Sequence, residues 1–294
     1  MLKSANFENL LDERLRKVYF NTLQEVPSKI PALYNIVSSD KAVEYDYEIG
    51  DIGSIGTFNG KIDYQDIDGQ YRTTYEHTEY AGGIQIQKRL LDDDQYSVIN
   101  KAPMLLAVAM RRRRETDAAE VFNSAFSTGT TYGDGLCLCN GAHTALGVST
   151  TWSNAGSSAL SPASLSAARL AMKKFTSSSD AIVDIDPDMV LTAIEMEETA
   201  TEIIKTDRQV DSANNNINFN QDRYKLIIWR YLTDTNDWFL LDSRLMKMQL
   251  NWFNRIGVEF NKDVDSDTYI RKWSSYMRYS NGASGWRFIY GSSV

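Results

Sequence analysis

The chain is poor in the sulfur and nitrogen side chains that hold transition metals. Its 294 residues include only two cysteines, Cys137 and Cys139, and two histidines, His77 and His143. Two cysteines exclude a disulfide framework, and a Cys-x-Cys pair is too closely spaced for an easy disulfide. Cys137, Cys139 and His143 could form part of a soft-metal site. Buried thiols are the simpler interpretation, so we expect no metal.

Long apolar runs and nucleotide-binding motifs are also missing. No stretch reaches the roughly 18 apolar residues of a membrane helix, so no membrane span is expected. The sequence contains no Gly-x-Gly-x-x-Gly and no phosphate loop, because Gly60-Lys61 is followed by Ile62. A net charge of −8 and a pI near 5.0 argue against broad phosphate binding. We therefore predict no cofactor and no catalytic residues, although a carboxylate-dependent hydrolase stays open because carboxylate spacing depends on the fold.

Residues 41–80 are the most informative segment. Apolar and polar residues alternate there, and Asp68-Gly69 predicts a tight turn between two strands. The segment has nine acidic residues against three basic ones, a net charge of −6. A lone two-stranded ribbon is marginal in water unless something covers it. The segment therefore indicates a protein that assembles with copies of itself.

A strand at 83–90 and a long helix follow this segment. The helix is expected to begin at Pro103 and to end near Phe126, before a glycine-rich stop at Gly133–Gly135. Four arginines, Arg111 to Arg114, sweep a full helical turn, so some of them should meet acidic residues. We predict that ribbon carboxylates face the arginines of a neighbouring subunit. The residues predicted for this contact are Arg112, Arg113, Asp63, Asp66, Asp68, Glu76 and Glu79.

The remaining elements are predicted from periodicity and capping signals. An amphipathic helix is expected at 6–24. Ser161-Pro162 begins a second helix, and Asp186-Pro187 is expected to begin another, through Val190, Leu191 and Ile194. Strands are predicted at 224–231 and 238–241.

This order of elements resembles the major capsid proteins of tailed bacteriophages, which share the Hong Kong-type capsid fold. The resemblance rests on the acidic hairpin, the strand leading to Ala102-Pro103-Met104-Leu105, the long spine helix and the Gly-Asp-Gly stop. It implies an α+β fold with five segments. They are an N-terminal arm (1–40), an extended β-hairpin loop (41–82), a peripheral domain with the spine helix (83–160), an axial domain (161–244), and a return to the peripheral domain with a C-terminal strand (245–294).

The resemblance also implies a function without enzymatic activity. Subunits of this family self-assemble into pentamers and hexamers that form the icosahedral head around double-stranded DNA. The implied partners are further copies of the chain, a separate scaffolding protein or none, a portal and a decoration protein. The implied location is the virion capsid, assembled in the bacterial host cytoplasm. An encapsulin-like nanocompartment shell is the alternative, since it resembles the same fold.

Overall fold

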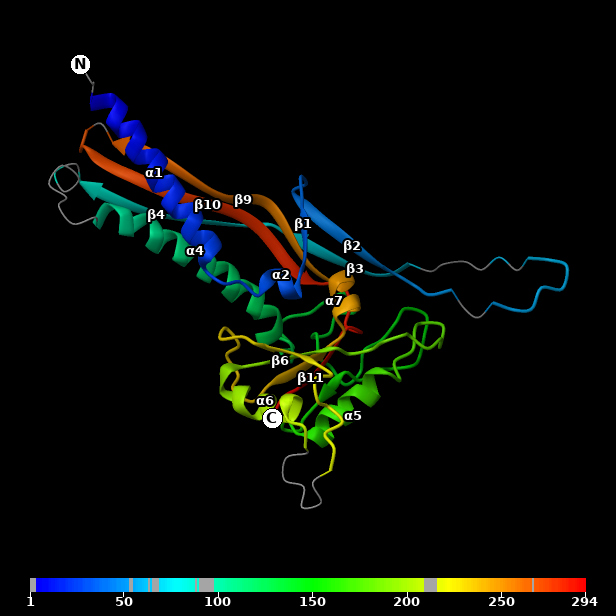
Figure 1. The fold of residues 1–294 in the computed structure, drawn as a ribbon. Coiled ribbons are helices and arrows are strands. Elements are labelled where there is room, and N and C mark those ends of the chain that lie inside the picture. The colour runs from blue at the N-terminus through cyan, green and yellow to red at the C-terminus, as the bar shows by residue number, and fades with distance from the viewer. Residues whose placement is uncertain are drawn as a thin grey trace.

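The computed structural model describes residues 4–52, 55–62, 64, 69–87, 89, 98–208, 216–265 and 267–294. Figure 1 shows an elongated layer of long strands with two long helices, a compact unit beneath it, and a ribbon that projects to one side. The predicted α+β class is confirmed, because helices occur together with sheets in which most of the described strand pairs are antiparallel. Within the described ranges, no helix has both the length and the hydropathy needed to cross a membrane.

A four-stranded sheet in the order β1, β9, β10, β4 forms the elongated layer. Its strands are β1 (Asn35–Ser38), β9 (Leu250–Asp265), β10 (Ile270–Ala283) and β4 (Thr78–Gln87). β9 and β10 form a long hairpin, β4 pairs antiparallel with β10, and β1 runs parallel to β9. The strand predicted at 83–90 is thus the second half of β4 and ends at Gln87.

Helix α1 (Ser4–Glu25) confirms the helix predicted at 6–24. It packs on the sheet and on α4, and the one-turn helix α2 (Ile30–Leu33) follows it. Tyr19 of α1 stacks on Phe260 of β9, with ring centroids 4.7 Å apart, and its hydroxyl lies 2.6 Å from Ser275 Oγ of β10. These contacts hold the N-terminal helix against the body of its own subunit.

The long helix α4 (Val98–Asn123) begins earlier than predicted, so Pro103 lies inside it rather than at its first position. A proline near the start of a helix loses only one bond, to the carbonyl four residues back, and burial of the helix offsets this cost. The apolar face of this helix does not include Leu105, which its helical spacing with Ala109 and Phe122 favours as a buried position. Leu105 is 69% exposed, whereas Leu106 and Met110 are buried.

The ribbon consists of β2 (Val43–Ile49) and β3 (Gly69–Glu76), which pair antiparallel. The tight turn predicted at Asp68-Gly69 is wrong, because Gly69 begins β3 and pairs with Ile49. The described residues between the two strands, 50–52, 55–62 and 64, form a loop beyond the paired strands, and Figure 1 shows this loop at the far end of the ribbon. Ile62 and Tyr64, expected in a strand, lie in this loop without strand structure.

The compact unit is built on a five-stranded sheet in the order β5, β11, β8, β6, β7. Its strands are β5 (Ala155–Gly156), β11 (Ile289–Ser292), β8 (Trp238–Leu241), β6 (Met189–Thr192) and β7 (Lys225–Ile228). Around it lie α5 (Pro162–Met172), the 3-10 helix η1 (Ile194–Met196) and α6 (Glu197–Lys205). Helix α7 (Ser243–Gln249) follows β8 and contacts α2, β1 and β9 of the elongated layer. The strands predicted at 224–231 and 238–241 are confirmed by β7 and β8.

Two helices were predicted from a proline at the first helical position, and one of the two predictions is correct. The helix after Ser161 is confirmed as α5, because Ser161 and Ser164 form a reciprocal capping box. The helix predicted from Pro187 is wrong. Residues Met189 to Thr192 are all buried and form β6 between β7 and β8. The boundaries of the five predicted segments stay a prediction.

Candidate assembly surfaces

Arg111 and Arg114 of the arginine turn are engaged inside the subunit. Arg111 Nη2 donates a 2.5 Å hydrogen bond to the carbonyl of Leu23 in α1. Arg114 lies with its guanidinium carbon 5.2 Å from the ring centroid of Trp252, and its Nη2 is 3.4 Å from Asn254 Oδ1. Burial lowers the pKa of Arg114, which remains a cation at any physiological pH. These two arginines therefore tie α4 to α1 and to β9.

Arg113 is part of an aromatic ladder on the sheet. It forms an ion pair of 2.7 Å with Asp117, one turn along α4, and lies 4.7 Å from the ring centroid of Tyr80. A hydrogen bond to the Tyr80 hydroxyl and the Asp117 charge raise the pKa of Arg113. Tyr279 stacks on Tyr80 and donates to Asp117 at 2.6 Å, and burial followed by this bond raises the pKa of Tyr279. Arg113 thus supports the subunit's own fold.

Arg112 differs from the other three arginines. It is exposed on α4, and its side chain has no partner among the residues that the structure describes. Arg112 is therefore available for a contact with a neighbouring subunit, and that contact stays a prediction. The sequence feature that distinguishes these arginines is the aromatic content of β4, β9 and β10. It provides rings on which Arg113 and Arg114 stack.

The ribbon acids predicted to face this turn are not gathered in one place. Asp63, Asp66 and Asp68 lie outside the described residues. Glu76 is exposed at the end of β3. Glu79 lies on β4 and is 3.7 Å from Arg278 of the same subunit. A contact between these acids and Arg112 of a neighbour stays a prediction.

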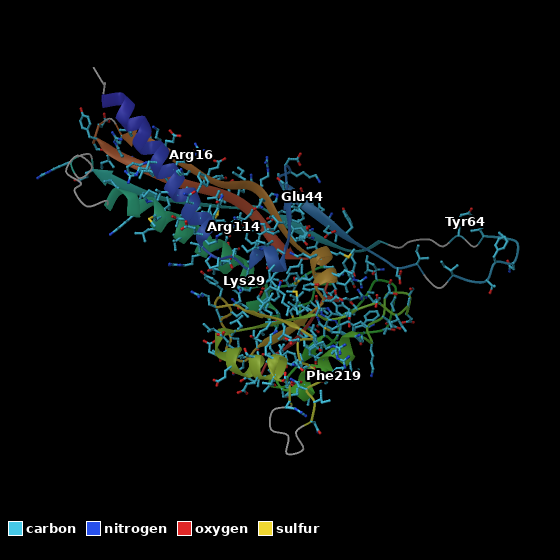
Figure 2. All side chains as sticks on the ribbon, in the orientation of Figure 1. Arg16, Lys29, Glu44, Tyr64, Arg114 and Phe219 are labelled. Atoms are coloured by element: carbon cyan, nitrogen blue, oxygen red, sulfur yellow. The ribbon has the colours of Figure 1, made fainter. Side chains whose placement is uncertain are left out.

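The far loop of the ribbon carries exposed apolar side chains that the charge pattern did not reveal. They line a hollow of about 750 Å³ together with Gly56, Thr57, Asn59 and Lys61. The exposed fractions are 49% for Ile52, 91% for Ile55, 73% for Phe58, 59% for Ile62 and 86% for Tyr64. Figure 2 shows Tyr64 far from the body of the subunit. Such a concentration of exposed apolar surface marks an interaction site.

A buried ion pair anchors the base of the ribbon. Glu48 Oε1 of β2 lies 2.9 Å from Arg287 Nη1, and Arg287 in turn lies over Trp286 and Trp152, 4.7 and 5.2 Å from their ring centroids. Burial raises the pKa of Glu48 more than the attraction of Arg287 lowers it. The pair therefore links β2, at the base of the ribbon, to the segment between β10 and β11.

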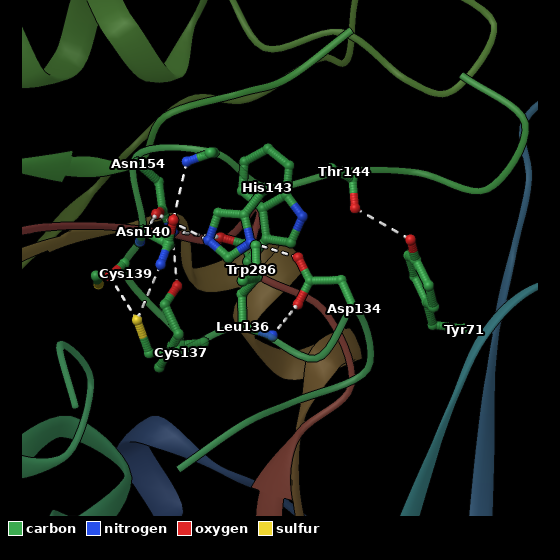
Figure 3. A network of polar contacts seen from close by, with 12 residues as sticks. Tyr71, Asp134, Leu136, Cys137, Cys139, Asn140, His143, Thr144, Asn154 and Trp286 are labelled. Carbon is green, nitrogen blue, oxygen red and sulfur yellow. Dashed lines mark hydrogen bonds and ion pairs between the residues drawn. The ribbon is translucent and has the colours of Figure 1, made fainter. Parts of the chain in front are cut away.

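Next to this pair lies a network around His143 (Figure 3). Its Nδ1 is 2.6 Å from Asp134 Oδ2, and its Nε2 is 3.1 Å from Asn154 Oδ1. The ring stacks on Trp286 at 4.4 Å with an interplanar angle of 5°. Asp134 belongs to the Gly-Asp-Gly turn, whose Gly135 has a φ of +78°, a conformation that favours glycine. The turn therefore serves to present Asp134 to His143.

The two cysteines do not join His143 in a metal site. Cys137 Sγ donates toward the carbonyl of Cys139 and accepts from Asn140 Nδ2, at 3.3 and 3.2 Å. Burial raises the pKa of Cys139, so it is a neutral thiol. Across the described ranges, no three His, Cys, Asp or Glu side chains are grouped closely enough to hold a metal ion.

Glu115 of α4 joins three parts of the subunit. The carboxylate is 2% exposed. It accepts hydrogen bonds from Ser28 Oγ at 2.5 Å, from the Lys29 amide at 3.3 Å and from Trp229 Nε1 at 3.0 Å. Ser28 and Lys29 follow α1, and Trp229 follows β7. Glu115 therefore links the N-terminal segment, the spine helix and the five-stranded unit.

Solved capsid structures share this fold. The structure of Microbacterium phage Oxtober96 is 8% identical, with 90% of each chain covered and a TM-score of 0.59. The procapsid of bacteriophage JBD30 is 13% identical over 100% of this chain and 76% of its own, with a TM-score of 0.59. The capsid of a native GTA particle is 14% identical over 92% of both chains, with a TM-score of 0.56. Identities this low show the fold alone.

The family assignment rests on the sequence rather than on the likeness of folds. No curated protein matches the chain. Residues 70–291, from the start of β3 into β11, match the family described as phage capsid protein. The chain therefore belongs to the phage capsid protein family, and it has the Hong Kong-type fold of tailed-phage major capsid proteins.

Proposed function

We propose that this protein is the major capsid protein of a tailed phage, whose copies assemble into pentamers and hexamers that close an icosahedral shell around double-stranded DNA. The observation that carries the proposal is the ribbon loop, where Ile55, Phe58 and Tyr64 are exposed and Tyr64 lies far from the body of the subunit (Figure 2). Apolar surface of this kind is stable only when another molecule covers it. The net charge of −8 supports a shell that encloses DNA without gripping its phosphates.

Variants of matched exposed isoleucines test this role. Ile55 is 91% exposed on the ribbon loop, and Ile182 is 82% exposed on the compact unit. Ile55→Asp should prevent closed particles, because burying an isoleucine contributes about 1.5–3 kcal/mol per interface. Ile182→Asp should leave assembly unchanged. Light scattering and negative-stain microscopy give the readout, and an unaltered protein that remains a monomer at every concentration and salt would contradict the proposal.

Arg112 is the second element of the proposed assembly surface. It is exposed and has no partner among the described residues, so we place it opposite ribbon carboxylates of a neighbouring subunit, with Glu76 as a described candidate. Arg112→Glu should weaken assembly, and Lys101→Glu on the same helix is the matched control because Lys101 is also exposed and unpaired in the described part of the chain. Equal assembly of both variants would remove Arg112 from the interface.

The nanocompartment alternative and the hydrolase alternative have no observation in their favour, because the family match is to phage capsid proteins. The proposal further places the protein in the virion capsid after assembly in the host cytoplasm. A scaffolding protein, a portal and a decoration protein are its proposed partners. Mass spectrometry of proteins that copurify with particles from infected cells tests each of them.

A further inference from the structure

The hydrogen bonds of Asn154 fix the direction of its side-chain amide. The residue is fully buried, and its Oδ1 accepts from the Asn140 amide at 2.8 Å. Its Nδ2 donates to three backbone carbonyls, those of Leu138, Trp286 and Ile289. The reversed amide would set N–H against N–H at Asn140 and oxygen against oxygen at the three carbonyls, so it is excluded. Asn154 Oδ1 is therefore the atom that faces His143 Nε2, 3.1 Å away (Figure 3).

Both ring nitrogens of His143 consequently face hydrogen-bond acceptors. Nε2 faces the amide oxygen of Asn154, and Nδ1 lies 2.6 Å from Asp134 Oδ2. The other oxygen of Asp134 accepts from the Leu136 amide at 3.1 Å, which favours the carboxylate form. A neutral imidazole has one N–H and one lone pair, so one of its nitrogens would oppose an acceptor. The ring is 1% exposed, so solvent cannot relieve that contact, whereas an imidazolium satisfies both sides.

The charged groups around the ring favour the same protonation state. The titratable and charged residues packed beside it are Glu48, Tyr132, Asp134, Cys137 and Arg287, with Asp51 next to Arg287. Burial raises the pKa of Tyr132, so its hydroxyl is neutral, and the Cys137 thiol donates to a backbone carbonyl. The carboxylates of Glu48 and Asp134 therefore share one guanidinium group unless His143 supplies a second positive charge. Stacking of the ring on an indole also favours a cation.

The pair of His143 and Asp134 lies where the ribbon joins the rest of the subunit. A Cβ at Gly133 would lie 3.2 Å from Thr73 Oγ1 of β3, so the Gly-Asp-Gly turn packs directly against the ribbon. Tyr71 of the same strand contacts the loop that carries His143, because its hydroxyl lies 3.1 Å from Thr144 Oγ1 (Figure 3). β3 therefore rests on two segments that this pair ties together.

We propose that the pair of His143 and Asp134 is a buried proton-binding site: His143 is an imidazolium, and its second proton holds the Gly-Asp-Gly turn, and with it β3, in place. Loss of this proton sets a lone pair of the ring against an acceptor, so the ring and the turn separate. β3 then moves with the turn, whereas β2 stays attached through Glu48 and Arg287. The direction of the ribbon is thus set by pH, since histidine is the side chain that exchanges a proton near neutrality.

Ring NMR of the unassembled subunit with ¹⁵N-labelled histidine measures this protonation directly, because the chain contains only His77 and His143. At neutral pH both ring nitrogens of His143 should carry hydrogens, and His143→Gln should remove these signals. His77 is the internal reference, since burial lowers its pKa and it should show a single N–H. A His143 ring with a single N–H at neutral pH would overturn the proposal.

Spin labels measure the direction of the ribbon. Asn59→Cys on the ribbon loop and Ser157→Cys on the compact unit place them at exposed positions, while Cys137 and Cys139 are buried. The distance between the labels should shift across the pH range in which NMR shows loss of the second His143 hydrogen. A constant distance across that range, or persistence of both hydrogens until the subunit unfolds, would overturn the role of the proton in holding the ribbon.

Two variants separate this proton from other effects. Asp134→Asn lets an amide N–H donate to Nδ1 of a neutral ring, so the label distance should no longer depend on pH. Glu198→Gln removes one negative charge at an exposed position of α6 and should leave the pH-dependent shift intact. A shift that survives in Asp134→Asn would assign the movement to another group and overturn the proposal. All measurements use the unassembled subunit, so none of these failures would refute the proposed capsid function.

Discussion

Removal of the Glu115 carboxylate should destabilise the whole subunit, because three of its parts donate to this one group. The side chain is 2% exposed and accepts from Ser28 Oγ, the Lys29 amide and Trp229 Nε1. Glu115→Ala leaves the indole N–H and the amide buried without an acceptor. Each unpaired donor costs about 1–3 kcal/mol. We therefore expect a loss of about 3–5 kcal/mol in the free energy of unfolding, in line with other broken buried networks.

Thermal and urea unfolding of the unassembled subunit measure this loss. For a chain of this size, about 1 kcal/mol corresponds to about 2–4 °C in Tm, so Glu115→Ala should melt roughly 6–20 °C lower. The Tm of Glu115→Gln should lie between those of the original chain and of Glu115→Ala. The amide oxygen of glutamine can still accept a hydrogen bond, but its NH₂ group faces other donors. A double-mutant cycle with Trp229→Phe isolates the indole bond, whose coupling should be about 1.5–3 kcal/mol.

One result would refute the reasoning. If Glu115→Ala unfolds within about 1 kcal/mol of the original chain, a solvated or rearranged pocket must satisfy the donors, and Glu115 is no junction. If the loss is large but the cycle with Trp229→Phe shows no coupling, the carboxylate acts through Ser28 and Lys29 alone. The link between the spine helix and the five-stranded unit would then lie elsewhere.

Three further predictions concern single positions. A Cβ at Gly291 would lie 2.6 Å from Cys139 Sγ, so Gly291→Ala should lower stability by about 1–3 kcal/mol through overpacking; an unchanged Tm would show that the site yields. Burial raises the pKa of Glu48, so the folded state holds its proton to higher pH than the unfolded state, and this contribution to stability is lost as pH rises through the raised pKa. Glu48→Gln removes the titrating group and should therefore make the Tm fall less steeply with pH above the ordinary pKa of a glutamate. An unaltered dependence of the Tm on pH would contradict this. Arg113→Glu should lower the Tm of the free subunit, unlike Arg112→Glu, because only Arg113 is stacked and paired within it.

Local signals predicted the helices well where capping and periodicity agreed. The helix after Ser161 has both a capping box and a proline at its first position, and it formed as expected. The segment from Met189 to Thr192 has a similar proline upstream, yet it is a strand. Its four residues are all buried between two neighbouring strands, and a sequence without its tertiary partners cannot show that the sheet lies there.

The ribbon shows a second limit of sequence reasoning. Asp68-Gly69 has the composition of a two-residue turn, but the pairing of Ile49 with Gly69 moves the reversal into a longer loop. The excess of acidic residues favoured a contact through carboxylates, whereas exposed apolar residues of the same loop, such as Ile55 and Phe58, are the clearer assembly signal. Exposure depends on how far the loop reaches from the body, and composition does not contain that distance.

The arginine turn explains why opposite charges in a sequence do not identify an interface by themselves. A guanidinium group can pair with a carboxylate or lie flat on an aromatic ring, and the long sheet of this subunit offers Tyr80 and Trp252 to Arg113 and Arg114. Those two arginines already have partners within their own subunit. The groups left for assembly are the ones that the fold cannot satisfy, such as Arg112. Unsatisfied donors and acceptors, rather than net charge, therefore locate the surfaces on which this shell is predicted to close.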